Sequence, residues 1–417
     1  MFFGRNNGIM ANYADIIVAG AGASGMIAAY YAAITNKSVI LLDHNDKIGR
    51  KILLTGNGKC NLTNLKMNSE CYCRENAEFA MKVISKFDEK DVMNFFTENG
   101  LLLHEKNGYV YPNANQAQAV NDFFGMLLKQ NNITIFNKVN ISDVCRKELF
   151  VLKTDKGDFL CRKLIIAAGS MAYPKTGSDG SFYNIVKKLG HKVVKPRPAL
   201  TALQSDFSFL KDITGVRCDG NAELFIDDNC VYSERGEIQI TDYGLSGIPI
   251  FQFSRYAVCA VDEKKHVSCR IDLLPDYTEK EILEFLHKRL SDNRCIGEAF
   301  AGMINRKLSD MIIRYSGFLG RECSTDFTDE KILKLIDSLK NLEFKITGYK
   351  GSDFGQVCQG GVSVDEISPD TMESLLVKDL YFAGEIVDVD GICGGYNLQW
   401  AWSSGYVAGK ACADDSN

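Results

Sequence analysis

Short apolar runs separated by helical patterns occupy the first and last parts of the chain. The runs that end at Ala19, Asp43, Gly169 and Glu385 are almost uniformly apolar and are bounded by glycine or polar residues. Such runs are typical of strands that are buried on both faces of a parallel sheet. The pattern therefore predicts an α/β sheet whose strands come from both ends of the sequence.

Apolar residues spaced three and four positions apart predict the helices that accompany these strands. Helices are expected at 26–33, 76–99 (as two helices), 116–130, 178–189 and 396–409. An Asn-Gly pair at 107–108 predicts a hairpin, and alternating segments between 133 and 160 predict strands joined by turns.

From about residue 195 the pattern changes. Pro196 and Pro198 mark a boundary, and short β-like segments follow at 222–226, 236–240 and 266–272. Charged helical stretches come next, near 279–291, 298–316 and 328–340. We therefore expect residues 195–345 to be an inserted module with a β part and a helical part, whose 243–249 loop is a candidate wall of a substrate pocket.

Composition narrows the functional class. The 417 residues suffice for two or three domains, and 46% hydrophobic with 24% charged residues is ordinary for a soluble globular enzyme. A net charge of −5 argues against a nucleic-acid partner or an anionic membrane surface. No apolar run approaches a membrane span, and no signal-peptide hydrophobic region is present. These features predict a cytoplasmic protein, with residues 1–12 as a disordered extension.

Fourteen cysteines are scattered along the sequence without paired zinc-type spacing. This distribution fits reduced thiols in a cytosol better than a disulfide framework. No metal site is expected.

The glycine motif Gly20-x-Gly22-x-x-Gly25 lies between the first strand and the first helix. Gly20 permits the tight turn, Gly22 lets the backbone approach a pyrophosphate, and Gly25 allows close packing of helix on strand. The helix N-terminus then faces the phosphates, and Asp43 at the end of the second strand suits a ribose hydroxyl. The motif predicts a dinucleotide site.

Two further segments suit a cofactor with a second end to hold. A polar loop after Asp43, residues 44–64, would lie over the dinucleotide at the carboxyl edge of the sheet. Near the C-terminus, a strand ending at Gly384 and Glu385 leads through a glycine loop into the helix that starts at Tyr396. That helix N-terminus predicts a second site for an anion or a dipole.

Several motifs resemble those of the BaiN-like flavoproteins, which are NAD(P)/FAD-dependent oxidoreductases. They are Gly20-Ala-Gly-Ala-Ser-Gly25, Gly49-Arg-Lys51, Gly56-Asn-Gly-Lys-Cys-Asn-Leu-Thr-Asn64, Gly244-Leu-Ser-Gly247, Gly360-Gly-Val-Ser363, 380–391 and 394–406. The resemblance covers nearly the whole chain. It implies a Rossmann-like FAD-binding domain (13–194 and 346–417) split by an inserted β-barrel (about 195–275 and 327–345) and a helical subdomain (about 276–326).

The same resemblance implies the residues that contact FAD, carried over by position. They are Gly20, Gly22, Ala23, Ser24, Gly25, Asp43, Arg50, Lys51, Thr55, Gly56, Asn61, Val139, Ala168, Gly169, Gly384, Glu385, Gly395, Tyr396 and Asn397. Two positions depart from the family pattern. The acid after the second strand is often Glu and is Asp43 here, and Cys393 stands where a threonine is expected, which places a thiol beside the flavin.

The reaction that the resemblance implies is NAD(P)H-driven reduction of an activated C=C bond in a small, hydrophobic, steroid- or bile-acid-like ketone. A proton donor is required at the carbon α to the carbonyl, and a second donor must polarise the carbonyl oxygen. Tyr173 and Tyr396 are candidate proton donors, and Arg50 or Lys51 could polarise the oxygen. Cys60 and Cys393 could instead form a redox pair, although they lack CxxC spacing.

Two other functional hypotheses remain open at this point. A second NAD(P) fingerprint is absent, so either the nicotinamide docks transiently or the substrate supplies the electrons. The latter would make the protein a flavin oxidase of a small amine or aminoketone. A third hypothesis is a flavin-binding redox sensor without turnover.

Overall fold

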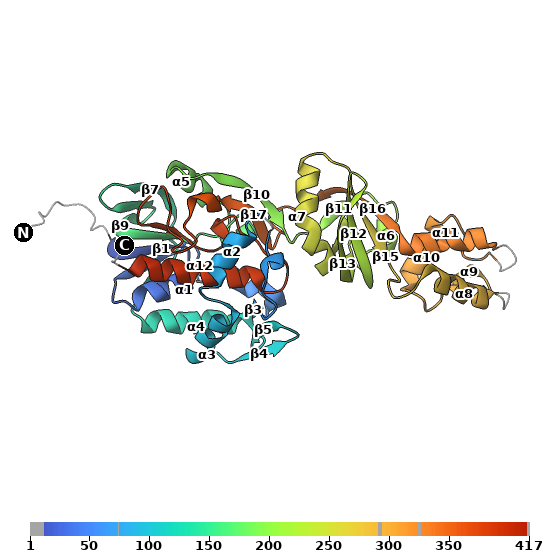
Figure 1. Cartoon of the computed structure of the whole chain (residues 1–417), viewed down its shortest axis with the longest axis horizontal. Coiled ribbons are helices and arrows are strands. Elements are labelled where there is room, and N and C mark those ends of the chain that lie inside the picture. Colours follow the sequence, from blue (N-terminus) through green and yellow to red (C-terminus); the bar gives the residue numbers. More distant parts are fainter. Residues whose placement is uncertain (1–11, 74, 291–293, 323–326, 415–417) are drawn as a thin grey trace, which may run out of the picture. The chain divides into compact units, whose positions relative to one another are not determined.

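The computed structural model describes residues 12–73, 75–290, 294–322 and 327–414 (Figure 1). The chain divides into two compact units, one made of Met1–Arg197 with Val357–Asn417 and the other of Pro198–Gln356. The disordered extension expected at 1–12 lies outside the described residues except for Asn12, which begins the first strand.

The first unit is built on a seven-stranded sheet with the order β6-β2-β1-β9-β8-β7, in which β18 also pairs with β9. Its strands are β1 (Asn12–Ala19), β2 (Val39–Leu42), β6 (Thr134–Phe136), β7 (Ile141–Arg146), β8 (Phe150–Thr154), β9 (Gly157–Ile166) and β18 (Leu380–Phe382). The pairs β1–β2, β1–β9, β2–β6 and β9–β18 are parallel, whereas β7, β8 and β9 form an antiparallel meander. The predicted α/β sheet, with a strand from the C-terminal part, is therefore present.

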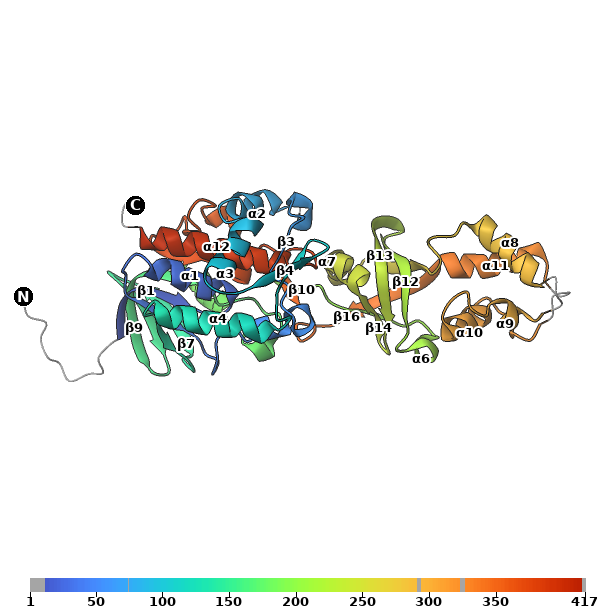
Figure 2. The same ribbon diagram turned by 90° about the horizontal axis from the view of Figure 1, so that it is seen from below.

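Helices α1 (Ala23–Ala33) and α12 (Tyr396–Ala413) lie side by side in both views (Figures 1 and 2). Two glycines of α12 permit this close approach. A Cβ atom on Gly405 would come within 2.4 Å of the Ser24 carbonyl oxygen, and one on Gly409 within 2.4 Å of the Ala28 carbonyl oxygen. The first and last helices of the chain are thus packed backbone to backbone.

Several other elements of this unit agree with the predicted ones. They are α2 (Ala77–Ile84), α3 (Glu89–Glu98), the hairpin strands β4 (Leu103–Lys106) and β5 (Tyr109–Pro112), and α4 (Ala117–Gln130). The sequence pattern did not predict β3 (Thr63–Asn64), which lies in the segment expected as a loop, or the paired strands β10 (Val193–Ala199) and β17 (Val357–Val362). Helix α5 (Phe182–Lys188) is shorter than the expected 178–189 because Gly180 has a left-handed φ of 77°.

The second unit contains a closed six-stranded barrel with the order β11-β14-β13-β12-β15-β16. Its strands are β11 (Leu203–Ser205), β12 (Arg217–Ile226), β13 (Asn229–Ile240), β14 (Gly244–Gly247), β15 (Val267–Asp272) and β16 (Leu342–Tyr349). The segment 243–249, expected as a loop, forms β14 and the first turn of α7 (Ile248–Asp262). The barrel is filled by side chains such as Leu224, Ile238 and Phe344, which are fully buried.

The helices of the second unit are α6 (Leu210–Ile213), α8 (Glu279–Leu290), α9 (Ile296–Ala299), α10 (Arg306–Tyr315) and α11 (Asp329–Lys340). The sequence-based boundaries assigned 327–345 to the barrel, but α11 occupies most of that range and only β16 returns to the barrel, continuing to Tyr349. Within the described ranges, no helix combines the length and the apolarity needed to cross a membrane.

Candidate functional site

Four parallel strands of the first unit end at the same edge of the sheet. Ala19 at the end of β1 pairs with Leu42 of β2 and with Ile166 of β9, and Ile166 also pairs with Phe382 of β18. The segments after these strands carry Gly20, Asp43, Ala168 with Gly169, and Gly384. Since ligands of open α/β sheets bind beyond the carboxyl ends of the strands, this edge is the candidate site.

The glycine turn at 20–25 combines two crowded positions with one open position. A Cβ on Gly20 would lie 2.3 Å from the Ala167 carbonyl oxygen, and one on Gly25 would lie 1.8 Å from the Gly20 carbonyl oxygen. By contrast, a Cβ on Gly22 would have no atom within 4 Å. Gly22 is the N-cap of α1, and no side chain caps that helix. The turn therefore presents backbone N–H groups to an open space that suits a phosphate group.

The second glycine turn, at Gly384, contacts the first one. Ser24 Oγ donates to the Ala383 carbonyl oxygen at 3.3 Å, and a Cβ on Gly384 would lie 2.3 Å from Ser24 Oγ. Helix α12 holds Gly384 from its other side, because the Gly384 N–H donates to Ser404 Oγ and Trp400 Nε1 donates to the Gly384 carbonyl oxygen. The turn after β18 is therefore fixed against the N-terminus of α1.

Asp43, directly after β2, accepts hydrogen bonds from both the glycine turn and the loop that follows it. One carboxylate oxygen accepts from the Ala21 N–H at 2.7 Å, and the other accepts from the Asn45 N–H at 2.7 Å. The Asp43 carbonyl oxygen accepts from the N–H of Val139, which is buried. The predicted ribose acceptor therefore also shapes the glycine turn, a role that the sequence reasoning did not include.

The loop that contains Arg50 and Thr55 is held in place by its own polar groups. Arg50 Nη1 donates to Asn45 Oδ1, and Asn45 Nδ2 donates to the Thr176 carbonyl oxygen. Thr55 Oγ1 donates to the Ile52 carbonyl oxygen, and Gly56 follows with a left-handed φ of 54°. Asn45 thus connects this loop to the segment that follows Gly169.

Lys51 and Glu385 join the two halves of the site. Lys51 Nζ lies 2.6 Å from Glu385 Oε2, and the other Glu385 oxygen accepts from the Cys358 N–H at 3.1 Å. Both charged side chains are mostly buried, with 26% and 18% exposed. Burial next to the Glu385 charge raises the pKa of the Cys358 thiol to about 11.

The N-terminus of α12 forms the far end of the site. Its N-cap, Gly395, has a left-handed φ of 98° and provides no side-chain cap. Asn61 lies next to it, buried, and its Oδ1 atom has no hydrogen-bond partner. Asn397 points back into the preceding loop, where it accepts from the Gly391 N–H and donates to the Gly391 carbonyl oxygen. Asn397 therefore shapes the loop.

The segment after β9 carries Ala168, Gly169 and Tyr173. Gly169 has a φ of 72°, and a Cβ there would lie 2.9 Å from Ser178 Oγ. Tyr173 adopts a left-handed φ of 56°, which is uncommon for an aromatic residue and is favoured at functional sites. Partial burial raises the pKa of its phenol, so the Tyr173 hydroxyl holds its proton at neutral pH but is a weaker acid than an exposed tyrosine.

Tyr396 is placed differently from the other candidate donor. It is buried, its hydroxyl donates to the Lys66 carbonyl oxygen at 3.1 Å, and its own carbonyl accepts from the Tyr72 hydroxyl. Burial raises the pKa of Tyr396 well above its usual range. These contacts assign Tyr396 a packing role at the start of α12, so we retain Tyr173 as the tyrosine donor.

The two cysteines of the hypothetical redox pair differ in environment. Cys393 is partly exposed, whereas Cys60 is fully buried. Burial raises the pKa of the Cys60 thiol to about 12, which disfavours the thiolate that a redox reaction requires. This argues against a Cys60–Cys393 couple.

Some residues that hold the site in place were missed by the sequence reasoning. Ser404, Trp400, Gln399 and Asn45 fix the loops through hydrogen bonds. Gln399 Oε1, for example, accepts from Thr63 Oγ1 at 2.5 Å. Polar residues at 399, 403 and 404 in a mostly apolar helix were a usable signal, because buried polar groups in a helix require partners.

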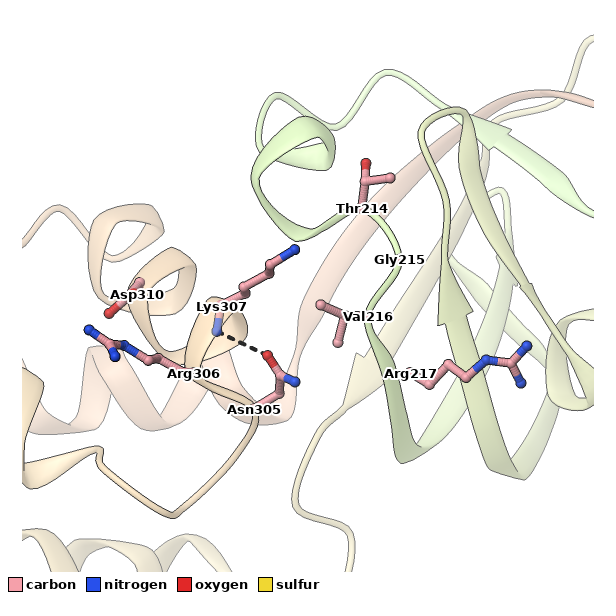
Figure 3. Close-up of a pocket in the computed structure, with 8 residues that line it drawn as sticks. All are labelled: Thr214, Gly215, Val216, Arg217, Asn305, Arg306, Lys307 and Asp310. Carbon is pink, nitrogen blue, oxygen red and sulfur yellow. Dashed lines mark hydrogen bonds between the residues drawn. The ribbon is translucent and has the colours of Figure 1, made fainter.

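A separate cavity of about 570 Å³ lies within the second unit (Figure 3). Its lining residues are Thr214, Gly215, Val216, Arg217, Asn305, Arg306, Lys307 and Asp310. The side chain of Lys307 extends toward Thr214, whereas Arg306 points away from it (Figure 3). Neither the predicted cofactor residues nor the segment 243–249 contributes to this lining.

Comparison with known proteins is consistent with this geometry. The sequence matches the family model "HI0933-like protein Rossmann domain" over residues 14–411. It is 35% identical over 404 residues to the 3-dehydro-bile acid delta(4,6)-reductase of Clostridium scindens, covering 95% of this chain and 98% of that protein. It is 31% identical over 415 residues to the ribosomal RNA dihydrouridine synthase of Haemophilus influenzae, covering 97% of this chain and 98% of that protein.

One solved structure, the 3-ketosteroid delta1-dehydrogenase of Sterolibacterium denitrificans in complex with 1,4-androstadiene-3,17-dione, has a similar fold. It aligns with a TM-score of 0.50 and 11% identity, over 97% of this chain and 100% of that one. The predicted fold class, a Rossmann-like FAD-binding domain with an inserted β-barrel and a helical part, is confirmed.

Proposed function

This chain belongs to the HI0933-like, BaiN-like flavoprotein family, and from that membership we propose that it is an FAD-dependent reductase of activated C=C bonds. The observation that carries the cofactor assignment is a pair of uncapped helix N-termini, α1 and α12, joined through the contact between Ser24 and Gly384. A ligand that reaches both needs an anionic or acceptor-rich group at each end, and FAD has its pyrophosphate and its flavin carbonyls.

The residues present fit FAD. Gly22 leaves open space for the pyrophosphate, Asp43 retains acceptor capacity for a ribose hydroxyl, and Asn61 offers a buried acceptor without a partner. The remaining predicted contacts, including those at Lys51, Thr55, Val139, Ala168 and Glu385, lie in the loops around the same sheet edge. Bound FAD would supply hydride-transfer chemistry.

The chain itself would supply orientation and the proton. In reducing a C=C bond conjugated to a carbonyl, hydride goes to the β-carbon and a proton goes to the α-carbon. We assign that proton to the hydroxyl of Tyr173, which is protonated at neutral pH and lies in the segment after β9 at the same edge of the sheet. Arg50, which is exposed and contacts Asn45 through Nη1, is the cation proposed to polarise the carbonyl oxygen.

We propose a hydrophobic, steroid- or bile-acid-like ketone as the substrate. The support is the 35% identity, over 95% of this chain, to a 3-dehydro-bile acid reductase. Conversion of uridine to dihydrouridine also reduces a C=C bond conjugated to a carbonyl. The 31% identity to a ribosomal RNA dihydrouridine synthase therefore makes uridine in RNA a second candidate substrate.

Charge favours the hydrophobic substrate over RNA. Residues 198–356 contain 20 lysines and arginines against 26 aspartates and glutamates, and the whole chain has a formal net charge of −5. RNA-binding surfaces carry an excess of positive charge. An excess of negative charge therefore disfavours a polyanion such as RNA much more than a steroid that carries at most one carboxylate.

The test is anaerobic rapid mixing of the FAD-loaded protein with NADH, NADPH or a small amine, followed by an unsaturated 3-oxo steroid. We expect NADH or NADPH to bleach the flavin absorption quickly and the steroid to restore it. Bleaching by the amine instead would support the oxidase hypothesis. Bleaching by none of these donors would support a redox sensor and contradict the reductase.

A further inference from the structure

The hairpin of β4 and β5 has two faces of different character. Val110 of β5 is fully buried and marks the face that packs on the core. Because side chains alternate along a strand, Tyr109 and Tyr111 lie on the opposite face. His104 of β4 pairs with Tyr111 and therefore lies on that face as well. The face that carries His104, Tyr109 and Tyr111 is called the aromatic face here.

The aromatic face lies against two turns of the candidate cofactor site. A Cβ on Gly394 would lie 3.2 Å from Tyr109 Cε1, and a Cβ on Gly56 would lie 3.8 Å from Tyr111 Cε1. Gly394 directly precedes the N-cap of α12, and Gly56 belongs to the loop that leads to Asn61. The two tyrosines therefore border the end of the site that we assign to the flavin ring.

Both tyrosines are accessible to a ligand. Tyr109 is 38% exposed, and Tyr111 is half-buried. Among the residues that the structure describes, neither hydroxyl has a hydrogen-bond partner. The rings of His104 and Tyr111 are stacked, with centroids 5.7 Å apart and planes inclined by 23°. This contact fixes the orientation of the Tyr111 ring and leaves its hydroxyl free.

The chemistry at the flavin ring limits which ligand can meet this face. Hydride transfer requires the reacting carbon to lie about 3–3.5 Å from the donor atom, so the substrate must also contact the residues around the ring. Sites for small molecules are lined mainly by aromatic and apolar side chains with a few polar groups. Two tyrosines provide both, and they suit a rigid apolar ring system better than a short, flexible amine.

We propose that Tyr109 and Tyr111 bind the ring system of the ketone substrate and are specificity-determining residues. The inference rests on the proposed function and deepens it, because it assigns substrate contacts to two side chains outside the predicted cofactor residues. Residues two positions apart on a strand are separated by about 7 Å. A four-ring steroid can therefore contact both tyrosines at once, whereas a single pyrimidine ring can stack on only one of them.

The test measures steroid binding to the FAD-loaded, oxidised protein. The uncharged steroid 4-androstene-3,17-dione is titrated into the wild type, Tyr109→Leu, Tyr111→Leu and Tyr111→Phe, and the change in flavin absorption gives the dissociation constant. We expect each leucine variant to bind the steroid roughly tenfold more weakly, because an aromatic contact surface is lost. Tyr111→Phe keeps the ring and should bind within about threefold of the wild type.

Tyr13→Leu is the matched control. Tyr13 is also exposed, at 47%, but it lies at the amino end of β1, opposite the carboxyl edge of the sheet. This variant should bind the steroid as the wild type does. Titration of each apoprotein with FAD should give the same affinity throughout. An equal loss of FAD affinity and steroid affinity in Tyr111→Leu would assign Tyr111 a supporting role for the cofactor loop and overturn the inference.

The remaining outcomes separate this inference from the proposed function. Leucine variants of the hairpin that lose no more steroid affinity than Tyr13→Leu would overturn the inference and leave the proposed function intact. A wild type that binds FAD, but neither binds the steroid nor is reoxidised by it after reduction, would overturn both. Uridine is the second probe. Uridine binding in place of steroid binding, weakened in one leucine variant only, would assign the aromatic face to a pyrimidine and overturn the steroid contact.

Discussion

Lys51 and Glu385 are 334 positions apart in the sequence, yet Lys51 Nζ lies 2.6 Å from Glu385 Oε2. The pair connects the loop after β2 to the turn after β18. Because Glu385 also accepts from the Cys358 N–H, one carboxylate fixes three segments of the first unit. The ion pair is therefore one of the contacts that join the early and late segments of the candidate site.

Replacing Lys51 with Met should destabilise the protein. It leaves the Glu385 carboxylate mostly buried without its cation, and we expect a loss of about 1–3 kcal/mol in the free energy of unfolding. Urea unfolding followed by fluorescence measures this loss. The control is Lys82→Met, which removes the exposed Lys82–Glu78 pair and should leave the urea midpoint unchanged. Equal effects of the two substitutions would contradict the role given to Lys51.

The turn at 20–25 predicts that two neighbouring substitutions differ in their effect on the stability of the apoprotein. A Cβ at Gly22 meets no atom, so Gly22→Ala should fold normally but bind FAD at least tenfold more weakly, because the methyl group fills the phosphate space. A Cβ at Gly25 would overlap the Gly20 carbonyl oxygen, so Gly25→Ala should lose stability as well. Thermal unfolding of the apoproteins and FAD titration separate the effects. A Gly22→Ala variant with wild-type FAD affinity would rule out this phosphate cradle.

The contact between α1 and α12 predicts a stability difference between two helical glycines. Gly409→Ala would place a methyl group 2.4 Å from the Ala28 carbonyl oxygen, and we expect a loss of about 1–3 kcal/mol. A Cβ on Gly125 in α4 would have no atom within 4 Å, so Gly125→Ala should stabilise the protein by about 0.5–1 kcal/mol. Urea midpoints give both values, and a neutral Gly409→Ala would show that the helices can separate at no cost.

His191 predicts a pH dependence of stability. The imidazole is buried, with Nδ1 next to Glu366 and Nε2 next to the Ser374 hydroxyl. Burial lowers its pKa below the usual 6.5, despite the opposing effect of Glu366. The unfolded chain therefore binds a proton more readily, so stability should fall as the pH drops below about 6.5 and level off above it.

The measurement for His191 is the urea midpoint between pH 5 and pH 8, in the wild type and in His191→Gln. The variant is expected to start less stable, because it loses two buried hydrogen bonds, but to show a shallower decline in acid. The same slope in both proteins would assign the acid sensitivity to other groups.

Much of the fold of the first unit could be predicted, because the apolar pattern of each strand matches the burial of that strand in the sheet. Uniformly apolar runs marked β1, β2, β9 and β18, and the glycine motif marked the turn before α1. The inserted barrel was less visible, since β16 follows a helix and strands such as β11 and β14 are short. Boundaries near 327–349 were therefore misplaced.

The candidate site was predictable in outline only. Gly22 and Gly384 could be recognised from sequence because each lies in a glycine turn that directly follows an apolar strand. The pairing of Lys51 with Glu385, the packing role of Tyr396 and the unpartnered oxygen of Asn61 depend on contacts between distant segments. Such contacts arise only when the loops assemble at one sheet edge, and no local pattern encodes them.

The central claim, reduction of an activated C=C bond, is tested most directly by the oxidative half-reaction. FAD-loaded protein is reduced anaerobically with one equivalent of dithionite and mixed with an unsaturated 3-oxo bile acid, while flavin absorption and product mass are followed. We predict that the flavin absorption returns and that the product gains two hydrogens per flavin reoxidised. A flavin that stays reduced with this substrate, and is reoxidised only when oxygen is admitted, would contradict the reductase assignment.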